Sequence, residues 1–226
     1  MKKLNVMRFE QIDSMGCVVA SLASVLTYHN VPNSSYEDVE KSFFIDREKG
    51  ISAPDLVLYL GNLGFSCEII GLQFSAFTLY EAQHFSQQDI ELRLKEFTTA
   101  ENISSFAANA ARQYLNTLNL GHKYTLKPPT IDILKTQIDK GNPVIIGIQP
   151  RVYSQKPVKA KDYLPSHAIV VHGYDDNGFF VIDSDKGKGH EDLEYLTNYE
   201  MHLALTVSMN GSLGDEGIII IEKKKL

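Results

Sequence analysis

Cys17 and three polar residues elsewhere in the chain have the types and spacing that a thiol active site requires. A cysteine attacks a carbonyl as its thiolate, which forms most readily in a positive environment. Cys17 follows Gly16 and precedes a run of small and apolar residues typical of a buried helix, so we expect its sulfur at the positive end of that helix. Gln11 lies six residues upstream, close enough to place its side-chain amide beside the sulfur as an oxyanion donor.

His167 is the candidate for the base that this cysteine needs. It begins an apolar run, 167–174, that predicts a strand, and a second strand-like run, 179–182, returns after a turn and ends at Asp183. In an antiparallel pair the start of one strand lies near the end of the next. We therefore expect Asp183 beside His167, where its carboxylate would orient the ring. Asp185 is an alternative to Asp183 in this role.

Each of these residues also has a purely structural interpretation. Cys17 would then be a small buried hydrophobe on a core helix, and Gln11 an ordinary exposed side chain. His167 would be a strand-end histidine with a satisfied hydrogen bond, and Asp183 would cap a turn. The functional interpretation is favoured because the four residues occur together, in an order that suits a thiol site.

The other cysteine and the other histidines are better explained as structural. Cys67 alternates with apolar neighbours in a predicted strand, and strand alternation directs His172 to the face opposite His167. The glycine-rich run 186–189 lacks the spacing of a phosphate-binding loop. We expect no metal site and no cofactor, because there are no paired cysteines and no H-E-x-x-H pattern. The remaining histidines are scattered along the sequence: His29, His84, His122, His190 and His202.

Hydrophobic patterning predicts one α+β domain over 1–226, with a helical first half and a strand-rich second half. The middle of the chain, 75–127, has helix-like runs and few strand signals, and we interpret it as a helical insertion or lid within that domain. The expected helices cover 17–29, 35–49, 52–63 and 131–139. The expected strands cover 65–70, 143–148, 167–174, 179–182 and 217–221. Residues 4–9 alternate apolar and polar, and we expect either a short strand or an extended lead-in there.

Composition and charge exclude several classes of protein. The 226 residues include 22 Lys and Arg and 28 Asp and Glu, for a net charge of −6, and the only basic cluster is 223–225, so a nucleic-acid partner is not expected. No run approaches the ~20 apolar residues of a membrane span. The N-terminus lacks the apolar region of a secretion signal, which favours a cytoplasmic location.

These residues together resemble the papain-like cysteine peptidase superfamily. Gln11 and Cys17, with a small-residue helix after the cysteine, resemble the first half of a papain-like site. The stretch 167–183 resembles the His-to-Asp hairpin of the bacterial bacteriocin-leader (double-glycine) peptidases and their stand-alone relatives. The stretches 50–56 and 63–68 are similar to the second helix and the strand of that family.

The resemblance implies a papain-like fold, in which a helical N-terminal half carries the cysteine and an antiparallel sheet carries the histidine and aspartate. It further implies a cysteine-dependent hydrolase of a peptide or amide substrate, working through an acyl-enzyme. Cys17 would be the nucleophile, His167 the base and Asp183 its orienting partner. Gln11 and the Cys17 backbone N–H would bind the oxyanion.

The chain departs from the family pattern next to its site residues. The family usually has an acidic residue before the cysteine and a glycine after it, where this chain has Gly16 and Val18. Asp183 is followed by Ser184, where the family commonly has proline. Two other functions therefore stay open, an acyltransferase of the same fold and a catalytically silent peptide-binding module. The resemblance leaves out 75–127 and the C-terminal part of the chain.

Overall fold

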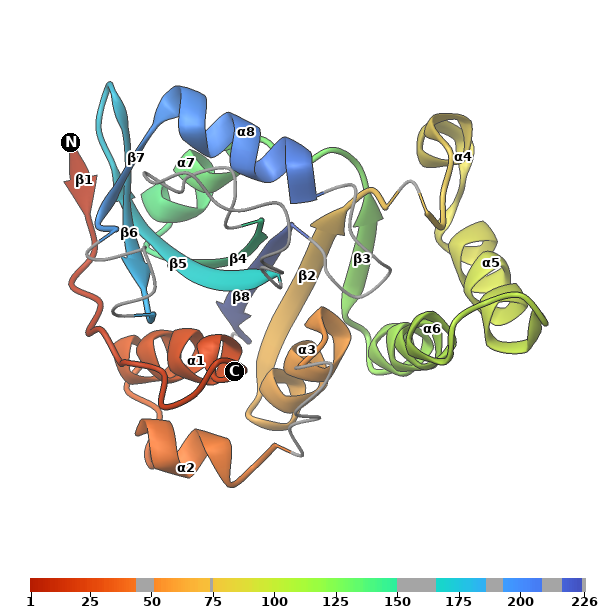
Figure 1. Cartoon of the computed structure of the whole chain (residues 1–226), viewed down its shortest axis with the longest axis horizontal. Coiled ribbons are helices and arrows are strands. Elements are labelled where there is room, and N and C mark those ends of the chain that lie inside the picture. Colours follow the sequence, from red (N-terminus) through yellow and green to blue (C-terminus); the bar gives the residue numbers. More distant parts are fainter. Residues whose placement is uncertain (44–50, 74, 150–165, 186–192, 209–216, 225–226) are drawn as a thin grey trace.

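The protein is built around one eight-stranded sheet with helices on both of its faces (Figure 1). The computed structural model describes residues 1–43, 51–73, 75–149, 166–185, 193–208 and 217–224. The predicted α+β class is confirmed. The helices are α1 Cys17–Tyr28, α2 Tyr36–Glu40, α3 Ala53–Asn62, α4 Leu79–His84, α5 Gln87–Thr99, α6 Ser105–Asn119, α7 Ile131–Asp139 and α8 Asn198–Ser208. The strands are β1 Lys2–Lys3, β2 Phe65–Gly71, β3 Lys123–Leu126, β4 Val144–Ile148, β5 His167–Tyr174, β6 Gly178–Asp183, β7 Tyr195–Thr197 and β8 Ile218–Lys223.

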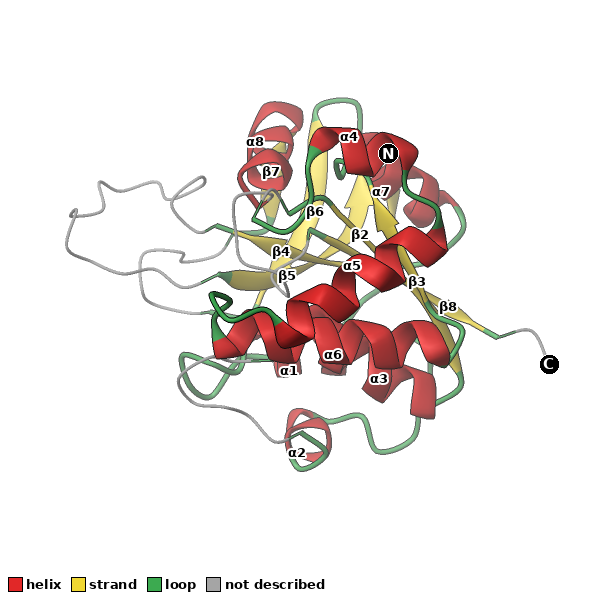
Figure 2. Ribbon diagram, turned by 90° about the vertical axis from the view of Figure 1, so that its right-hand side faces the viewer, coloured by secondary structure: helices red, strands yellow, loops and turns green. Residues whose placement is uncertain are grey.

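The strands follow the order β3-β2-β8-β4-β5-β6-β7, and β1 pairs with β5 beside this path. Every neighbouring pair is antiparallel except β2 and β3, which are parallel. Helices α1, α3 and α6 lie on one face of the sheet, and α7 and α8 lie on the other (Figures 1 and 2). The strands β4 and β5 are therefore covered on both sides, which explains their continuous apolar sequences.

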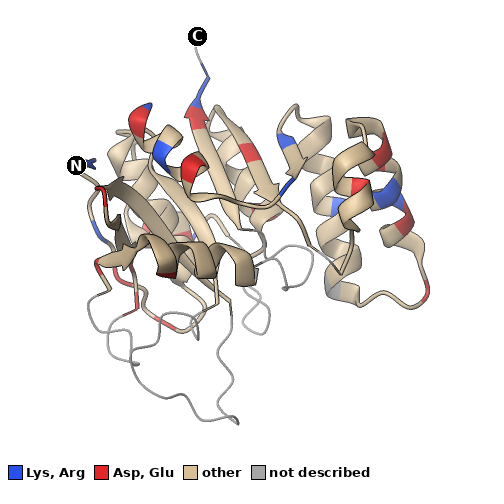
Figure 3. Ribbon diagram, turned by 90° about the horizontal axis from the view of Figure 1, so that it is seen from above, with Lys and Arg blue, Asp and Glu red and all other residues tan. Residues whose placement is uncertain are grey.

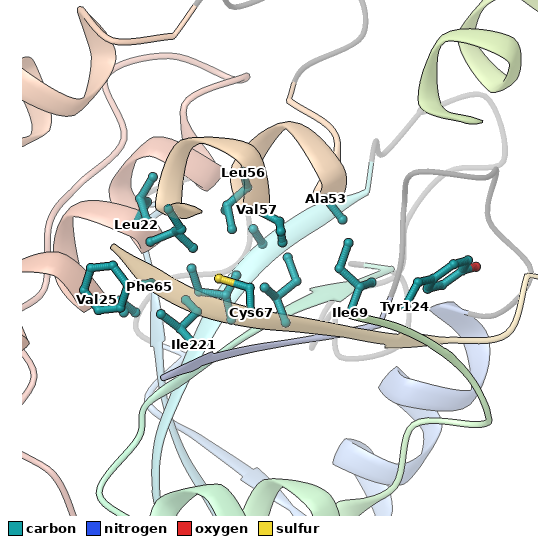
Figure 4. Close-up of a cluster of buried hydrophobic side chains, with 14 of the residues drawn as sticks. Leu22, Val25, Ala53, Leu56, Val57, Phe65, Cys67, Ile69, Tyr124 and Ile221 are labelled. Carbon is teal, nitrogen blue, oxygen red and sulfur yellow. The ribbon is translucent and has the colours of Figure 1, made fainter. Parts of the chain in front are cut away.

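The core on the α1 and α3 side of the sheet contains Cys67 (Figure 4). Its side chain lies among Phe65, Ile69 and Ile221, and the residue is 3% exposed. Burial raises the pKa of the Cys67 thiol to about 12, against a smaller opposing effect of Lys224. A thiol that stays protonated and inaccessible is neither a nucleophile nor a metal ligand at neutral pH, so Cys67 serves as a small core hydrophobe.

Local caps decide where the first helices begin and end. The predicted start of α3 is confirmed, because the Ser52 hydroxyl accepts a hydrogen bond from the Asp55 backbone N–H and Pro54 occupies the first turn. The helix predicted over 35–49 is confirmed over Tyr36–Glu40, but α2 ends at Glu40, so residues 41–43 are not helical. There the Ser42 hydroxyl donates to the Asp38 carbonyl and the chain turns. The rest of that prediction, 44–50, lies outside the described residues.

Of the two interpretations of 4–9, the short strand is wrong, since strand pairing stops at Lys3. The Leu4 N–H still donates to the His172 carbonyl at 2.7 Å. The Val6 N–H then bonds back to the Leu4 carbonyl, which turns the chain away from the sheet. This departure carries the following residues across the end of β6 and towards α1 (Figure 1).

The segment 75–127 contains the three helices α4 to α6, which lie at the far end of the sheet from α1 (Figure 1). Basic and acidic residues are interleaved along these helices (Figure 3). Arg93 of α5 forms ion pairs with Glu81 of α4 and with Glu96. The segment ends in β3, which the sequence did not indicate and which extends the sheet beside β2. Its role as an insertion or lid stays a prediction.

Candidate active site

Cys17 is the first residue of α1, and the loop before it is held by Asp13. The Asp13 carboxylate accepts the Met15 backbone N–H at 2.9 Å, and the Asp13 carbonyl accepts the Gly16 N–H at 3.2 Å. Gly16 occupies the N-cap position and offers no side chain to the first turn. The N–H groups of that turn and the helix dipole therefore act on the sulfur of Cys17.

A buried serine fixes α1 against β5. The Ser21 hydroxyl donates to the Ala168 carbonyl at 3.2 Å, and Ser21 is 2% exposed. Cys17 lies one helical turn before Ser21, and His167 lies one residue before Ala168. The contact therefore brings the thiol of Cys17 to the imidazole of His167, and a hydrogen bond between the two side chains is among the causes of the Cys17 pKa shift.

His167 and Asp183 form a buried pair. The His167 Nε2 lies 2.7 Å from Asp183 Oδ1, and the two side chains are 9% and 0% exposed. In the β5–β6 register Asp183 is opposite Ile169, so it is the diagonal neighbour of His167 on the same face of the sheet. Asp185 contributes only its backbone N–H, which donates to the same Asp183 oxygen at 2.9 Å. Of the two candidate carboxylates, Asp183 is the one that contacts the ring.

The electrostatics of Cys17 and His167 are complementary. Burial opposes ionisation of Cys17, but its pKa is lowered because the hydrogen bond and charge of His167, and the backbone N–H groups of Ala168 and Val18, stabilise the thiolate. Burial likewise acts against the imidazolium, but the pKa of His167 is raised by Asp183 and by Cys17. Nε2 is engaged by Asp183, so Nδ1 is the ring nitrogen available to the thiol. This environment favours a thiolate–imidazolium pair at neutral pH.

Gln11 lies beside the start of α1, as the sequence predicts. A β-carbon built on Gly16 would be 3.3 Å from the β-carbon of Gln11, which shows how closely the two backbones approach. The Gln11 amide nitrogen donates to the Asp13 carbonyl at 3.0 Å. The amide oxygen accepts a hydrogen bond from the Ser184 hydroxyl at 2.9 Å. The structure therefore brings together all four residues that the sequence singles out.

Comparison with known proteins shows the family of the chain. The model of the Peptidase_C39 like family matches residues 3–202. The chain belongs to this family. A crystal structure of a protein assigned to the C39-like peptidases, from Bacillus anthracis, is similar over 100% of both chains, with 15% identity and a TM-score of 0.42. No curated protein matches the chain significantly. The family match supports cysteine peptidase activity.

Gly16 departs from the acidic residue that the C39-like pattern usually has before the cysteine, and Tyr36 explains this difference. A β-carbon at position 16 would overlap the hydroxyl oxygen of Tyr36, which packs against the Gly16 backbone from α2. Tyr36 is 4% exposed, and its hydroxyl proton has no acceptor among the described residues. The tyrosine ring thus fills the space that a side chain before Cys17 would need.

We expect Gly16→Ala to lower the free energy of unfolding by about 1–3 kcal/mol, as overpacking of a filled site does. Gly16 has φ −83°, which alanine adopts freely, so the penalty is steric. Tyr36→Phe removes the overlapping oxygen and with it the contact of that oxygen with the Ile12 backbone, so we expect it to cost about 1 kcal/mol by itself. Urea unfolding of the parent, both single variants and the double variant measures these effects. A double variant no more stable than Gly16→Ala would show that Tyr36 is not the obstacle.

The other histidines bond to the backbone or lie away from the thiol. His172 Nδ1 is 2.9 Å from the Leu4 carbonyl, and burial lowers the pKa of His172. His122 Nδ1 accepts the Cys67 backbone N–H at 3.2 Å.

Across the described ranges, no group of three or more His, Cys, Asp and Glu is placed to hold a metal ion. In the same ranges no helix is both long and apolar enough to cross a bilayer. His190 and the run 186–189 lie outside the described residues.

Sequence reasoning missed three residues that support the site, namely Ser21, Tyr36 and Ser184. Ser21 sits one turn after Cys17 in an apolar helix, and a lone serine on a buried helix is a weak signal for a docking contact. Tyr36 is an aromatic residue in a short helix and carries no distinguishing pattern. Ser184 had a visible signal, because it replaces the proline that usually follows the aspartate in C39-like proteins.

Proposed function

We propose that the protein is a cysteine peptidase in which Cys17 is the nucleophile, His167 the base and Asp183 the residue that orients His167. The observation that carries this proposal is the buried His167–Asp183 pair at 2.7 Å beside a cysteine whose pKa is lowered. A core cysteine next to a structural histidine would not need a buried carboxylate behind the ring. Desolvation makes such a carboxylate costly unless it has a charged partner.

The chemistry follows from the positions of the side chains. In the thiolate–imidazolium pair His167 Nδ1 already holds the proton of Cys17. The thiolate sulfur attacks the carbonyl carbon of the scissile amide, forming a C–S bond while the carbonyl electron pair moves to oxygen. The Cys17 N–H and the Gln11 amide bind this oxyanion. His167 then gives its proton to the leaving nitrogen as the C–N bond breaks. Water, deprotonated by His167, attacks the thioester, and the C–S bond breaks to release the acid and the thiol.

Incubation with a peptide library in H₂¹⁸O tests this function without a known substrate. The library is a tryptic digest of bacterial proteins, and mass spectrometry is used to find new peptide ends. We expect the parent to produce new C-termini that carry ¹⁸O, because water resolves the acyl-enzyme. Cys17→Ala should produce none, because the nucleophile is gone.

Cys67→Ala is the matched control, since it removes the other thiol from the core. It should cleave the same peptides as the parent. Glycinamide added to the reaction separates the two acyl-enzyme functions. If the products are joined to glycinamide and no ¹⁸O-labelled acids form, the protein is an acyltransferase and not a hydrolase. Binding of library peptides with no new ends, equally in the parent and in Cys17→Ala, would indicate a silent peptide-binding module.

A further inference from the structure

Ser184 is a buried serine that holds Gln11 by two separate hydrogen bonds. It directly follows the last residue of β6 and is 2% exposed. Its backbone carbonyl accepts the Gln11 N–H at 3.0 Å, and its hydroxyl lies 2.9 Å from Gln11 Oε1. One residue thus holds both the main chain and the side chain of the glutamine. A glutamine in this loop would otherwise have several rotamers, so the second contact restricts its amide.

The direction of the Gln11 amide is fixed by its two partners. The Asp13 carbonyl can only accept, so the atom 3.0 Å from it must be the amide nitrogen. The amide oxygen must then face Ser184, whose hydroxyl is the donor in that contact. With the oxygen engaged and one N–H used by Asp13, the amide keeps one N–H for a further acceptor. A rotated amide would instead present its oxygen, which would repel an oxyanion.

The turn at the end of β6 supports both functional groups of the site. Asp183 Oδ1 accepts from His167 Nε2 and from the Asp185 N–H, which orients the ring. The next side chain, Ser184, reaches the oxyanion donor Gln11. Adjacent residues of one short segment therefore position the base and the amide relative to each other.

We propose that Ser184 is a positioning residue that directs the Gln11 amide N–H towards the oxyanion. This inference rests on the proposed function, since it assigns Ser184 a role in the step in which Cys17 attacks a carbonyl. It predicts that loss of the hydroxyl slows acylation of Cys17 and leaves the nucleophilicity of the thiolate unchanged. A merely structural serine would not separate these two properties.

Two probes separate these properties without the natural substrate. p-Nitrophenyl acetate acylates the sulfur through a tetrahedral oxyanion: the C–S bond forms, the C–O bond breaks and p-nitrophenolate leaves. Iodoacetamide alkylates the same sulfur by displacement at a CH₂ carbon: the C–S bond forms, the C–I bond breaks and iodide leaves, with no oxyanion. Each rate is followed by mass spectrometry of the peptide that contains Cys17. The ratio of acylation to alkylation reports on the oxyanion donors alone.

Ser184→Ala is expected to lower the acylation rate about 10- to 100-fold, in the range of a misplaced rather than a missing donor. Its alkylation rate should equal that of the parent at each pH. Gln11→Ala should lower acylation about 100- to 1,000-fold, as loss of one oxyanion donor does. Because Ser184 acts through Gln11, the double variant should acylate no more slowly than Gln11→Ala.

Matched variants separate positioning from stability. Ser52→Ala removes another buried serine hydroxyl, the cap of α3, and should lower the thermal midpoint while leaving the ratio of the two rates unchanged. Ser184→Thr and Ser184→Val have the same shape and differ only in the hydroxyl. If Ser184→Ala does not fold, this pair gives the result, and threonine should acylate faster than valine.

Three results would overturn the role of Ser184 and leave the proposed function intact. The first is acylation at the parent rate in Ser184→Ala while Gln11→Ala is slow. The second is that Ser184→Ala slows acylation as much in the Gln11→Ala background as in the parent, and the third is that alkylation of Ser184→Ala falls in parallel with its acylation. The last of these would mean that Ser184 acts through Asp183 and His167. If Cys17 alkylates only as an ordinary thiol, and Gln11→Ala acylates like the parent, the proposed function itself fails. The two failures are thus distinguishable.

Discussion

His167→Ala is expected to remove the reactivity of Cys17 at neutral pH and to lower peptide turnover on the order of 10⁶-fold, as loss of the base does in comparable triads. In the parent, thiolate and imidazolium coexist between the lowered pKa of Cys17 and the raised pKa of His167. Alkylation by iodoacetamide should therefore rise with pH well below the ~8.5 of a free thiol. Without His167, burial is the largest remaining influence on Cys17 and raises its pKa, so alkylation should require more alkaline solution.

The measurement is the alkylation rate of each cysteine from pH 4 to 10 in the parent and in His167→Ala. Cys67 is an internal reference, because its thiol has a pKa of about 12 and is 3% exposed, so it should stay unreactive in both proteins. His172→Gln is a matched control, since it changes a second buried histidine of the same strand, whose ring contacts the Leu4 carbonyl. A parent Cys17 that titrates as an ordinary thiol, whatever occupies position 167, would contradict the thiolate–imidazolium pair.

The hairpin that carries His167 and Asp183 was predictable because its signals are local. The apolar runs mark both strands, and the turn between them contains Asp175, whose carboxylate accepts the N–H groups of Asn177 and Gly178. The start of α1 at Cys17 was predictable for the same reason, since a glycine precedes a run of small and apolar residues. Periodicity and turn chemistry over a few residues therefore locate the base and the nucleophile.

The features of the fold and of the site that could not be predicted from the sequence depend on contacts between distant segments. The contact between Gln11 and Ser184 joins residues 173 positions apart, and the contact between Ser21 and Ala168 joins residues 147 apart. No local pattern encodes such pairs. The strand β3 is similarly invisible in sequence, because its four residues gain strand structure only by pairing with β2. Residues 4–9 show the reverse case. Their alternating pattern is typical of a strand, but the hydrogen bond from the Val6 N–H to the Leu4 carbonyl turns the chain away from the sheet.

Asp183→Ala should lower turnover on the order of 10⁴-fold, the cost of losing the third member of a triad. Asp183 Oδ1 accepts both His167 and the Asp185 N–H, so alanine leaves the ring without a partner and loosens the turn at the end of β6. Asp183→Asn should lower turnover much less than Asp183→Ala does, because an amide oxygen at the Oδ1 position still accepts both hydrogen bonds. Peptide turnover by the two variants, at one pH near neutrality, measures this difference.

The pH dependence distinguishes the charge of Asp183 from its hydrogen bonds. The carboxylate stabilises the imidazolium and is one cause of the raised pKa of His167. Asparagine keeps the hydrogen bond but removes the charge, so the pKa of His167 falls and the imidazolium is lost at lower pH. The alkaline limb of the turnover profile should therefore move to lower pH in Asp183→Asn. The acidic limb reports ionisation of Cys17 and should stay below the pH at which an ordinary thiol ionises. An unmoved alkaline limb would mean that Asp183 orients His167 without contributing its charge.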